Sequence, residues 1–254
     1  MAEEIMEAVW AFCWGMVPAS GVLVGTVLGL TAHLRHRGVA AIMSLGAGVL
    51  LSLASVKVAS EALMLAGAAS VVGGIIFGGA TFSIANAALV TAKNRKRCGE
   101  CKPQPSEAEV PGSGTSIALG TALDAVPEAL ILGITLRASG PDVALVVALG
   151  LSNVPEALSG TAGMRLASRS TIYILSLWGG IMLLTAVTTA LAFHFLSGFG
   201  PQATAVLKAY GAGALIAMTA ETMIPEAFHN EPRYSGILTA AGFATLILVG
   251  ELAG

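Results

Sequence analysis

Charged residues are scarce in this sequence, which excludes most classes of water-soluble protein. Only 11 % of the 254 residues are charged and 55 % are hydrophobic, whereas a soluble domain carries about 25 % charged residues. The three cysteines are too few for a disulfide framework. We therefore expect an integral membrane protein whose surroundings are a lipid bilayer, and no nucleic-acid partner.

Long apolar runs, by contrast, fill most of the chain. A helix that crosses a membrane needs roughly 20 mostly apolar residues. The acidic start, Met1-Ala-Glu-Glu, lacks the basic residues of a signal peptide, so we expect the first run to be retained as a helix. We predict an all-α protein with eight transmembrane helices, at 9–32, 39–59, 65–92, 115–137, 142–163, 170–197, 203–226 and 234–253.

One long polar insertion, residues 93–114, separates the third helix from the fourth. It joins a basic run to prolines, acids and glycines, which is typical of a disordered loop. The predicted organisation is therefore helices 1–3 in residues 1–92, a disordered cytoplasmic loop in 93–114, helices 4 and 5 in 115–163, and helices 6–8 in 164–254.

The basic residues predict the orientation of these helices. If the amino terminus lies outside, ten of the thirteen lysines and arginines fall on the cytoplasmic side: Arg35, Arg37, Lys93, Arg95, Lys96, Arg97, Lys102, Arg165, Arg169 and Arg233. The positive-inside rule therefore favours both termini outside. We expect the protein in a plasma (inner) membrane.

An internal repeat links the two ends of the chain. Residues 46–62 and 211–227 align without gaps, with six of seventeen positions identical. Under the predicted orientation the second helix runs outward and the seventh inward, which is typical of inverted-topology transporters. Glycine- and alanine-rich helices also resemble one another by composition, but the shared Glu-Ala ending favours a repeat. We predict helices 1–3 inverted against helices 6–8, around central helices 4 and 5.

Two copies of Val-Pro-Glu-Ala-Leu, at 126–130 and 154–158, lie inside the fourth and fifth helices. Proline removes one helical hydrogen bond and displaces the carbonyl four residues earlier. A carboxylate at membrane depth costs at least a few kcal/mol, so it must face something other than lipid. Broken helices with buried acids are a common way to build cation sites in membranes.

Several polar residues surround these prolines. Asp124 and Glu128 are four residues apart and share one face of helix 4. Ser152 and Asn153 lie within reach of Glu156 in helix 5. Because a short loop joins the two helices, we expect these side chains to converge in one pocket suited to a divalent cation.

The alternative is a structural cluster in which the acids pair with buried bases. Lys57 and Lys208 are the bases within membrane depth, and both lie near helix ends, where they can reach the interface. Lys57 is also four residues before Glu61, which predicts an ion pair. A bolder possibility is that Lys57 reaches the pocket and replaces the charge of a second metal ion.

The motifs resemble those of the ZIP (Zrt/Irt-like) metal transporters, whose fourth helix carries His-Asn-x-Pro-Glu and whose fifth carries a related motif. The matching strings are residues 124–128 and 152–156, and residues 221–226 resemble the family's acidic ending of helix 7. The resemblance implies import of divalent transition metals (zinc, iron, manganese or cadmium) as substrate. It further implies a homodimer, elevator-like movement of one helix bundle, and a ligand set of Asp124, Glu128, Ser152, Asn153 and Glu156.

The sequence departs from the family motif at three positions. Asp124 stands where the family has histidine, Ala125 where it has asparagine, and Ser152 where many members have histidine or glutamine. The resulting all-oxygen site favours harder ions such as manganese or iron.

Three further features have more than one interpretation. Glu221 in helix 7 is a candidate metal ligand on the exit path, or a helix-end acid in water. The spacing of Gly21, Gly25 and Gly29 predicts close helix packing, inside the protein or across a dimer. Cys98 and Cys101 form a Cys-x-x-Cys that supplies only two of the four ligands of a zinc site, so incidental thiols in a solvated loop are favoured.

We predict a transporter rather than an enzyme, without an organic cofactor. The sequence has neither a His-Glu-x-x-His zinc-protease motif nor a Gly-x-Ser-x-Gly nucleophile motif. Two other functions stay open. The carboxylates would serve as proton relays in a proton-coupled transporter of another solute, or as ligands in a transport-inactive metal sensor.

Overall fold

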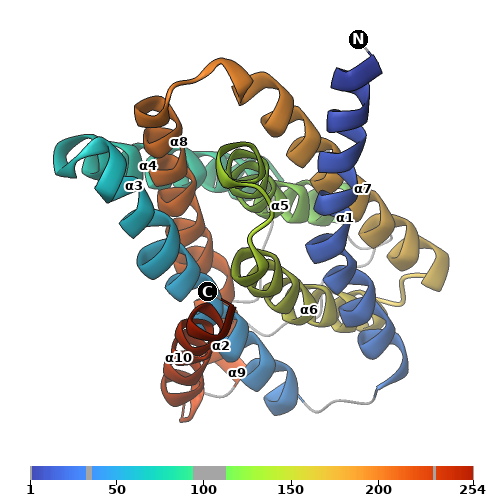
Figure 1. Cartoon of the computed structure of the whole chain (residues 1–254). Helices are drawn as coiled ribbons and strands as arrows, with labels where there is room; N and C mark the ends of the chain where they lie inside the picture. Colours follow the sequence, from blue (N-terminus) through green and yellow to red (C-terminus); the bar gives the residue numbers. More distant parts are fainter. Residues whose placement is uncertain (1, 33–35, 94–112, 231–232, 254) are drawn as a thin grey trace.

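A computed structural model of the chain describes residues 2–32, 36–93, 113–230 and 233–253. These residues form helices without strands, and eight of the helices are long and apolar enough to cross a membrane (Figure 1). The spans are Glu3–Thr31, Arg37–Ala66, Ala68–Leu89, Leu119–Ser139, Val143–Leu166, Thr171–Phe195, Pro201–Phe228 and Ser235–Leu252. The prediction of an all-α polytopic membrane protein with eight spans is confirmed.

The helical elements follow the spans closely. They are α1 Ala2–Thr31, α2 His36–Ser52, η1 Leu53–Ala59, α3 Ser60–Ala66, α4 Ala68–Lys93, α5 Ser113–Ser139, α6 Val143–Leu166, α7 Thr171–Phe195, η2 Leu196–Gly198, α8 Pro201–Met218, η3 Thr219–Met223, α9 Ile224–Asn230 and α10 Ser235–Ala253. The second span therefore consists of α2, η1 and α3, and the seventh of α8, η3 and α9. Residues 94–112, most of the predicted disordered loop, lie outside the described residues.

Local sequence signals fix several helix starts. The Asp142 carboxylate accepts a hydrogen bond from the Leu145 backbone N–H at 2.9 Å and caps α6. The Ser170 hydroxyl caps α7 in the same way, at 3.2 Å from the Tyr173 nitrogen. Pro201 is the first residue of α8, where its missing N–H costs no helical hydrogen bond.

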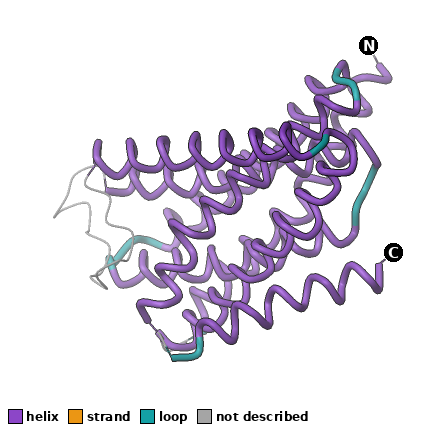
Figure 2. Tube along the Cα trace, turned by 90° about the vertical axis from the view of Figure 1, so that its left-hand side faces the viewer, coloured by secondary structure: helices purple, strands orange, loops and turns teal. Residues whose placement is uncertain are grey.

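The first and last helices share one end of the molecule. Figure 2 shows the start of α1 and the end of α10 on the same side of the helical bundle, as an even number of crossings requires. We call this the terminal end, and the opposite end, where α1 and α4 finish, the loop end. Along α5 the chain runs toward the terminal end, and along α6 it runs back.

The helices pack as two bundles. The first contains α1, α5, α6 and α7; the second contains α4, α10 and the second and seventh spans (Figure 1). The bundles meet where α5 and α6 contact α2 and α8. The central helices 4 and 5 of the sequence prediction therefore lie at the contact between the bundles.

Within the first bundle, α1 and α6 pack at backbone contact. A methyl group added to Gly21 would lie 2.3 Å from the Gly150 carbonyl oxygen, and one added to Gly25 would lie 2.2 Å from that of Val154. Such contacts are too short for any residue but glycine. The glycine spacing in the first helix thus serves packing inside the chain.

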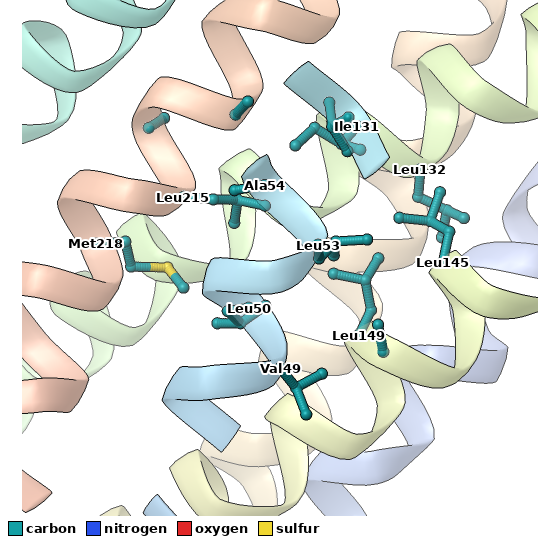
Figure 3. Close-up of a cluster of buried hydrophobic side chains, with 14 of the residues drawn as sticks. Val49, Leu50, Leu53, Ala54, Ile131, Leu132, Leu145, Leu149, Leu215 and Met218 are labelled. Carbon is teal, nitrogen blue, oxygen red and sulfur yellow. The ribbon is translucent and has the colours of Figure 1, made fainter. Parts of the chain in front are cut away.

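A layer of buried aliphatic side chains joins the two bundles (Figure 3). It comes from α2, η1, α5, α6 and α8, and six of its fully buried aliphatic residues form what we call the apolar plug: Leu53, Ile131, Leu132, Leu145, Leu149 and Leu215. In α5 these residues follow Glu128, and in α6 they precede Ser152. The plug therefore lies between the Pro-Glu motifs and the terminal end.

Candidate functional site

Both Pro-Glu motifs lie inside continuous helices. α5 runs through Pro127 and α6 runs through Pro155, so neither proline ends its helix. The irregular turns lie in the second and seventh spans instead, as the π-helical segments η1 and η3. Pro225 lies two residues after η3 and its ring displaces the carbonyl of Glu221, which favours the wider turn there.

The motif carboxylates of α5 and α6 lie together. Asp124 and Glu128 are both only 3 % exposed. The Ser152 hydroxyl lies 3.5 Å from Oε1 of Glu128, Asn153 is within hydrogen-bonding reach of the same carboxylate, and the Glu156 carboxylate is close enough to repel it. The structure therefore brings three of the predicted site residues, Ser152, Asn153 and Glu156, around Glu128.

Asn153 also holds the site against the first helix. Its Nδ2 donates a hydrogen bond to the Pro18 carbonyl oxygen at 3.1 Å. This bond lies beside the Gly21 contact with α6, so α1 fixes the orientation of the Asn153 amide. Sequence alone had no means to identify Pro18 as a partner, because the pairing depends on how two distant helices pack.

A small cavity opens beside these residues, at the contact between the two bundles. Its volume is about 20 Å³, which is enough for one water molecule or ion. It is lined by Met43, Asp124, Glu156, Met218, Thr222, Met223 and Glu226. Three carboxylates, one hydroxyl and three thioethers therefore surround the space, and none of these seven side chains is basic.

The carboxylates are spread along the walls of the cavity. Among the described residues, no three histidine, cysteine, aspartate or glutamate side chains lie close enough together to hold one metal ion. An ion in the cavity would therefore take part of its ligands from other groups on the walls or from water.

Glu226 is a cavity residue that the sequence prediction did not include among the metal ligands. It extends from α9 and accepts a hydrogen bond from the Ser159 hydroxyl of α6, so it bridges the two bundles beside Glu156. A signal was present: Pro225-Glu226 repeats the Pro-Glu pair of the fourth and fifth helices.

Glu221, the predicted ligand of helix 7, lies elsewhere. It is in η3, within the span, and its carboxylate accepts hydrogen bonds from Ser83 and, at 2.9 Å, from Nδ2 of Asn86, both on α4. It does not line the cavity. The helical turn that carries Glu221 thus directs it to α4 and directs Thr222 and Met223 to the cavity.

The two lysines at membrane depth form an ion network at the terminal end. Nζ of Lys57 lies 2.7 Å from Oδ2 of Asp142 and 3.7 Å from Oε1 of Glu61, and Nζ of Lys208 lies 2.9 Å from Oε2 of Glu61. The predicted Lys57–Glu61 pair is confirmed. The alternative that Lys57 reaches the metal pocket is wrong, because the apolar plug separates the two.

Neither the cysteine pair nor a known relative adds to the description of this site. Cys98 and Cys101 lie outside the described residues. No protein-family model and no curated protein matches the sequence. The geometry of the cavity is therefore the main guide to the function of the chain.

Proposed function

We propose that this chain transports divalent transition-metal cations across the membrane through the cavity between its two bundles, as the resemblance to ZIP transporters implies. The observation that carries the proposal is the cavity itself, which is lined by Asp124, Glu156 and Glu226 within the spans. Bringing carboxylates to this depth costs at least a few kcal/mol each. A divalent cation offsets that cost by stabilising their ionised forms.

The inverted repeat is part of this proposal, and four glycine contacts support it. A methyl group on Gly48 would clash with the carbonyl oxygen of Thr239, and a methyl group on Gly242 would clash with the carbonyl oxygen of Leu45. The register of the repeat pairs Gly48 with Gly213 and Leu45 with Tyr210. A methyl group on Gly213 would clash with the carbonyl oxygen of Ile75, and a methyl group on Gly78 would clash with the carbonyl oxygen of Tyr210. Span 2 thus packs against span 8 through the same kind of glycine contact by which span 7 packs against span 3.

The π-helical segments occur at matching places in the two repeats. The repeat register aligns η3, Thr219–Met223, with residues 54–58, which lie inside η1, Leu53–Ala59. Segments of this kind are rare and often occur at functional sites. Their correspondence supports a structural repeat rather than a chance likeness of glycine-rich helices.

Comparison of the two halves supports a cation in the cavity. In the first half Glu61 pairs with Lys208. In the repeat, Glu61 aligns with Glu226 and Lys208 aligns with Met43. Glu226 and Met43 both line the cavity. The glutamate of the first half, Glu61, thus lies beside the ammonium group of Lys208. The equivalent glutamate of the second half, Glu226, lies beside the cavity instead.

The position of the apolar plug supports alternating access. It separates the cavity from the terminal end, and the Lys57–Asp142 ion pair lies beyond it on the same side. An ion cannot cross a dry aliphatic layer without losing its hydration. We infer that transport requires the two bundles to shift so that the plug opens, with the terminal end outside as the basic residues favour.

Metal binding tests the proposal before any flux is measured. Manganese or zinc should raise the melting temperature of the purified protein, because a ligand that binds only the folded state stabilises it. The Glu156→Gln variant should lose this stabilisation, whereas Glu251→Gln, the same change at an exposed position in α10, should retain it.

The same experiment separates the other two functions. A protein whose melting temperature no divalent metal changes would contradict the proposal and favour a proton-coupled transporter. A protein that binds metal but moves none would favour the metal sensor.

A further inference from the structure

Three methionines line the cavity together with its carboxylates. Met43 comes from α2, Met218 from the end of α8 and Met223 from η3, and all three are at most 3 % exposed. Three of the seven lining residues are methionine, although the chain has only nine methionines in 254 residues. A concentration of this kind at one small cavity calls for a reason beyond general core packing.

The packing places Met223 at the contact between the two bundles. The terminal Cε of Met223 lies 3.2 Å from the position that a Cβ would take on Gly46, and Pro155 Cγ lies 2.6 Å from the same position. The tip of Met223 therefore reaches from η3 to α2, next to the residue before Glu156. Figure 3 shows the Met218 side chain extending from α8 toward α2.

The internal repeat provides a comparison within the same chain. Its register aligns Met218 with Leu53 and Met223 with Val58, both buried in the other half. The equivalent helix therefore packs with aliphatic side chains at these two places, without a thioether. The fold does not require methionine there.

We infer that Met43, Met218 and Met223 determine metal specificity, by offering soft thioether donors to an ion whose other ligands are the cavity carboxylates. Thioethers bind soft and borderline cations and interact weakly with hard ones. The preferred substrates are then softer cations such as cadmium rather than manganese. This inference rests on the proposed function, and it replaces the preference for hard ions that an all-oxygen site would give.

Cadmium and manganese are the probes, because they have the same charge and similar size but differ in softness. Uptake of each into proteoliposomes would be compared for the unaltered chain and the Met43→Leu/Met218→Leu/Met223→Leu variant. The control is Met164→Leu, a fully buried methionine of another core cluster. We expect the triple variant to lower the cadmium-to-manganese uptake ratio by about tenfold, the smaller of the effects seen when a group beside a bound metal is removed.

A spectroscopic measurement covers the case in which the triple variant folds poorly. Norleucine in place of methionine keeps the side-chain shape and exchanges only sulfur for CH₂. With all three cysteines replaced by serine, X-ray absorption of the cadmium-loaded protein should show cadmium–sulfur scattering in the methionine-containing chain and in its Met164→Leu variant, but not in the norleucine protein.

The outcomes separate this inference from the proposed function. An unchanged cadmium-to-manganese ratio, or cadmium with oxygen ligands alone, would overturn the role of the methionines while leaving metal transport standing. If the unaltered chain neither bound nor moved any of these metals, the proposed function would fail and the methionine inference with it.

Discussion

Nζ of Lys57 lies 2.7 Å from Oδ2 of Asp142, and this ion pair joins the two helix bundles at the terminal end of the molecule. Lys57 belongs to η1 in the second bundle. Asp142 belongs to the first bundle, where it also caps α6 through the Leu145 N–H. The Asp142 carboxylate therefore caps the start of α6 and also links α6 to the second bundle through Lys57.

The two roles of Asp142 can be separated by two substitutions. Asparagine removes the charge but remains a good helix cap, so Asp142→Asn should cost at most about 1 kcal/mol of stability, the range of a partly exposed ion pair. Asp142→Ala also removes the cap and should cost about 1 kcal/mol more. Thermal unfolding in detergent measures both. Equal losses in the two variants would show that the cap adds nothing.

The close contact between α1 and α6 predicts a second effect on stability. In Gly25→Ala the new methyl group would lie 2.2 Å from the Val154 carbonyl oxygen, and the helices must separate at a cost of about 1–3 kcal/mol. Gly180→Ala in α7, where no atom of another helix lies within 4 Å of the new methyl group, is the matched control. We expect a lower melting temperature for Gly25→Ala, independent of protein concentration. A melting temperature as high as that of the control would refute the contact.

The eight spans could be predicted from the sequence because each is a long apolar run, and this property does not depend on tertiary packing. The two Pro-Glu motifs could also be predicted as neighbours, since the loop that joins their helices is short. Asp124, Glu128, Ser152, Asn153 and Glu156 were identified in this way. These residues are a few positions apart within each helix, and such spacing can be read directly from the sequence.

The rest of the site depends on contacts between distant segments. Glu226 and Glu221 are five residues apart, and only the π-helical turn between them decides that Glu226 faces the cavity and Glu221 faces α4. Met43 and Met218 look like ordinary core residues in the sequence, because nothing local distinguishes a cavity wall from a packed core.

The two acids of the seventh span should differ in their effect on transport. Glu226→Gln removes a carboxylate from the cavity wall, whereas Glu221→Gln changes a side chain that is hydrogen-bonded to Ser83 and Asn86. We expect metal uptake to fall by at least about tenfold in Glu226→Gln and to change little in Glu221→Gln. The reverse order in an uptake assay would place the exit path at Glu221 and contradict the cavity geometry.

Metal binding should weaken as the pH is lowered from neutral to mildly acid. Carboxylate ligands bind metal only when deprotonated, so protons compete with the ion for the same oxygens. The affinity of manganese for the purified protein, followed by titration at a series of pH values, should fall steadily toward low pH. An affinity independent of pH would argue against carboxylate ligation.

Metal uptake into proteoliposomes that hold a metal-sensitive dye tests the central claim most directly. Manganese, iron, zinc and cadmium would be compared for the unaltered chain, Glu156→Gln and the control Glu251→Gln, each first verified as inserted in the membrane. The carboxylate-lined cavity predicts uptake by the unaltered chain and by Glu251→Gln, and its loss in Glu156→Gln. Uptake that continues unchanged in Glu156→Gln would contradict transport through this cavity.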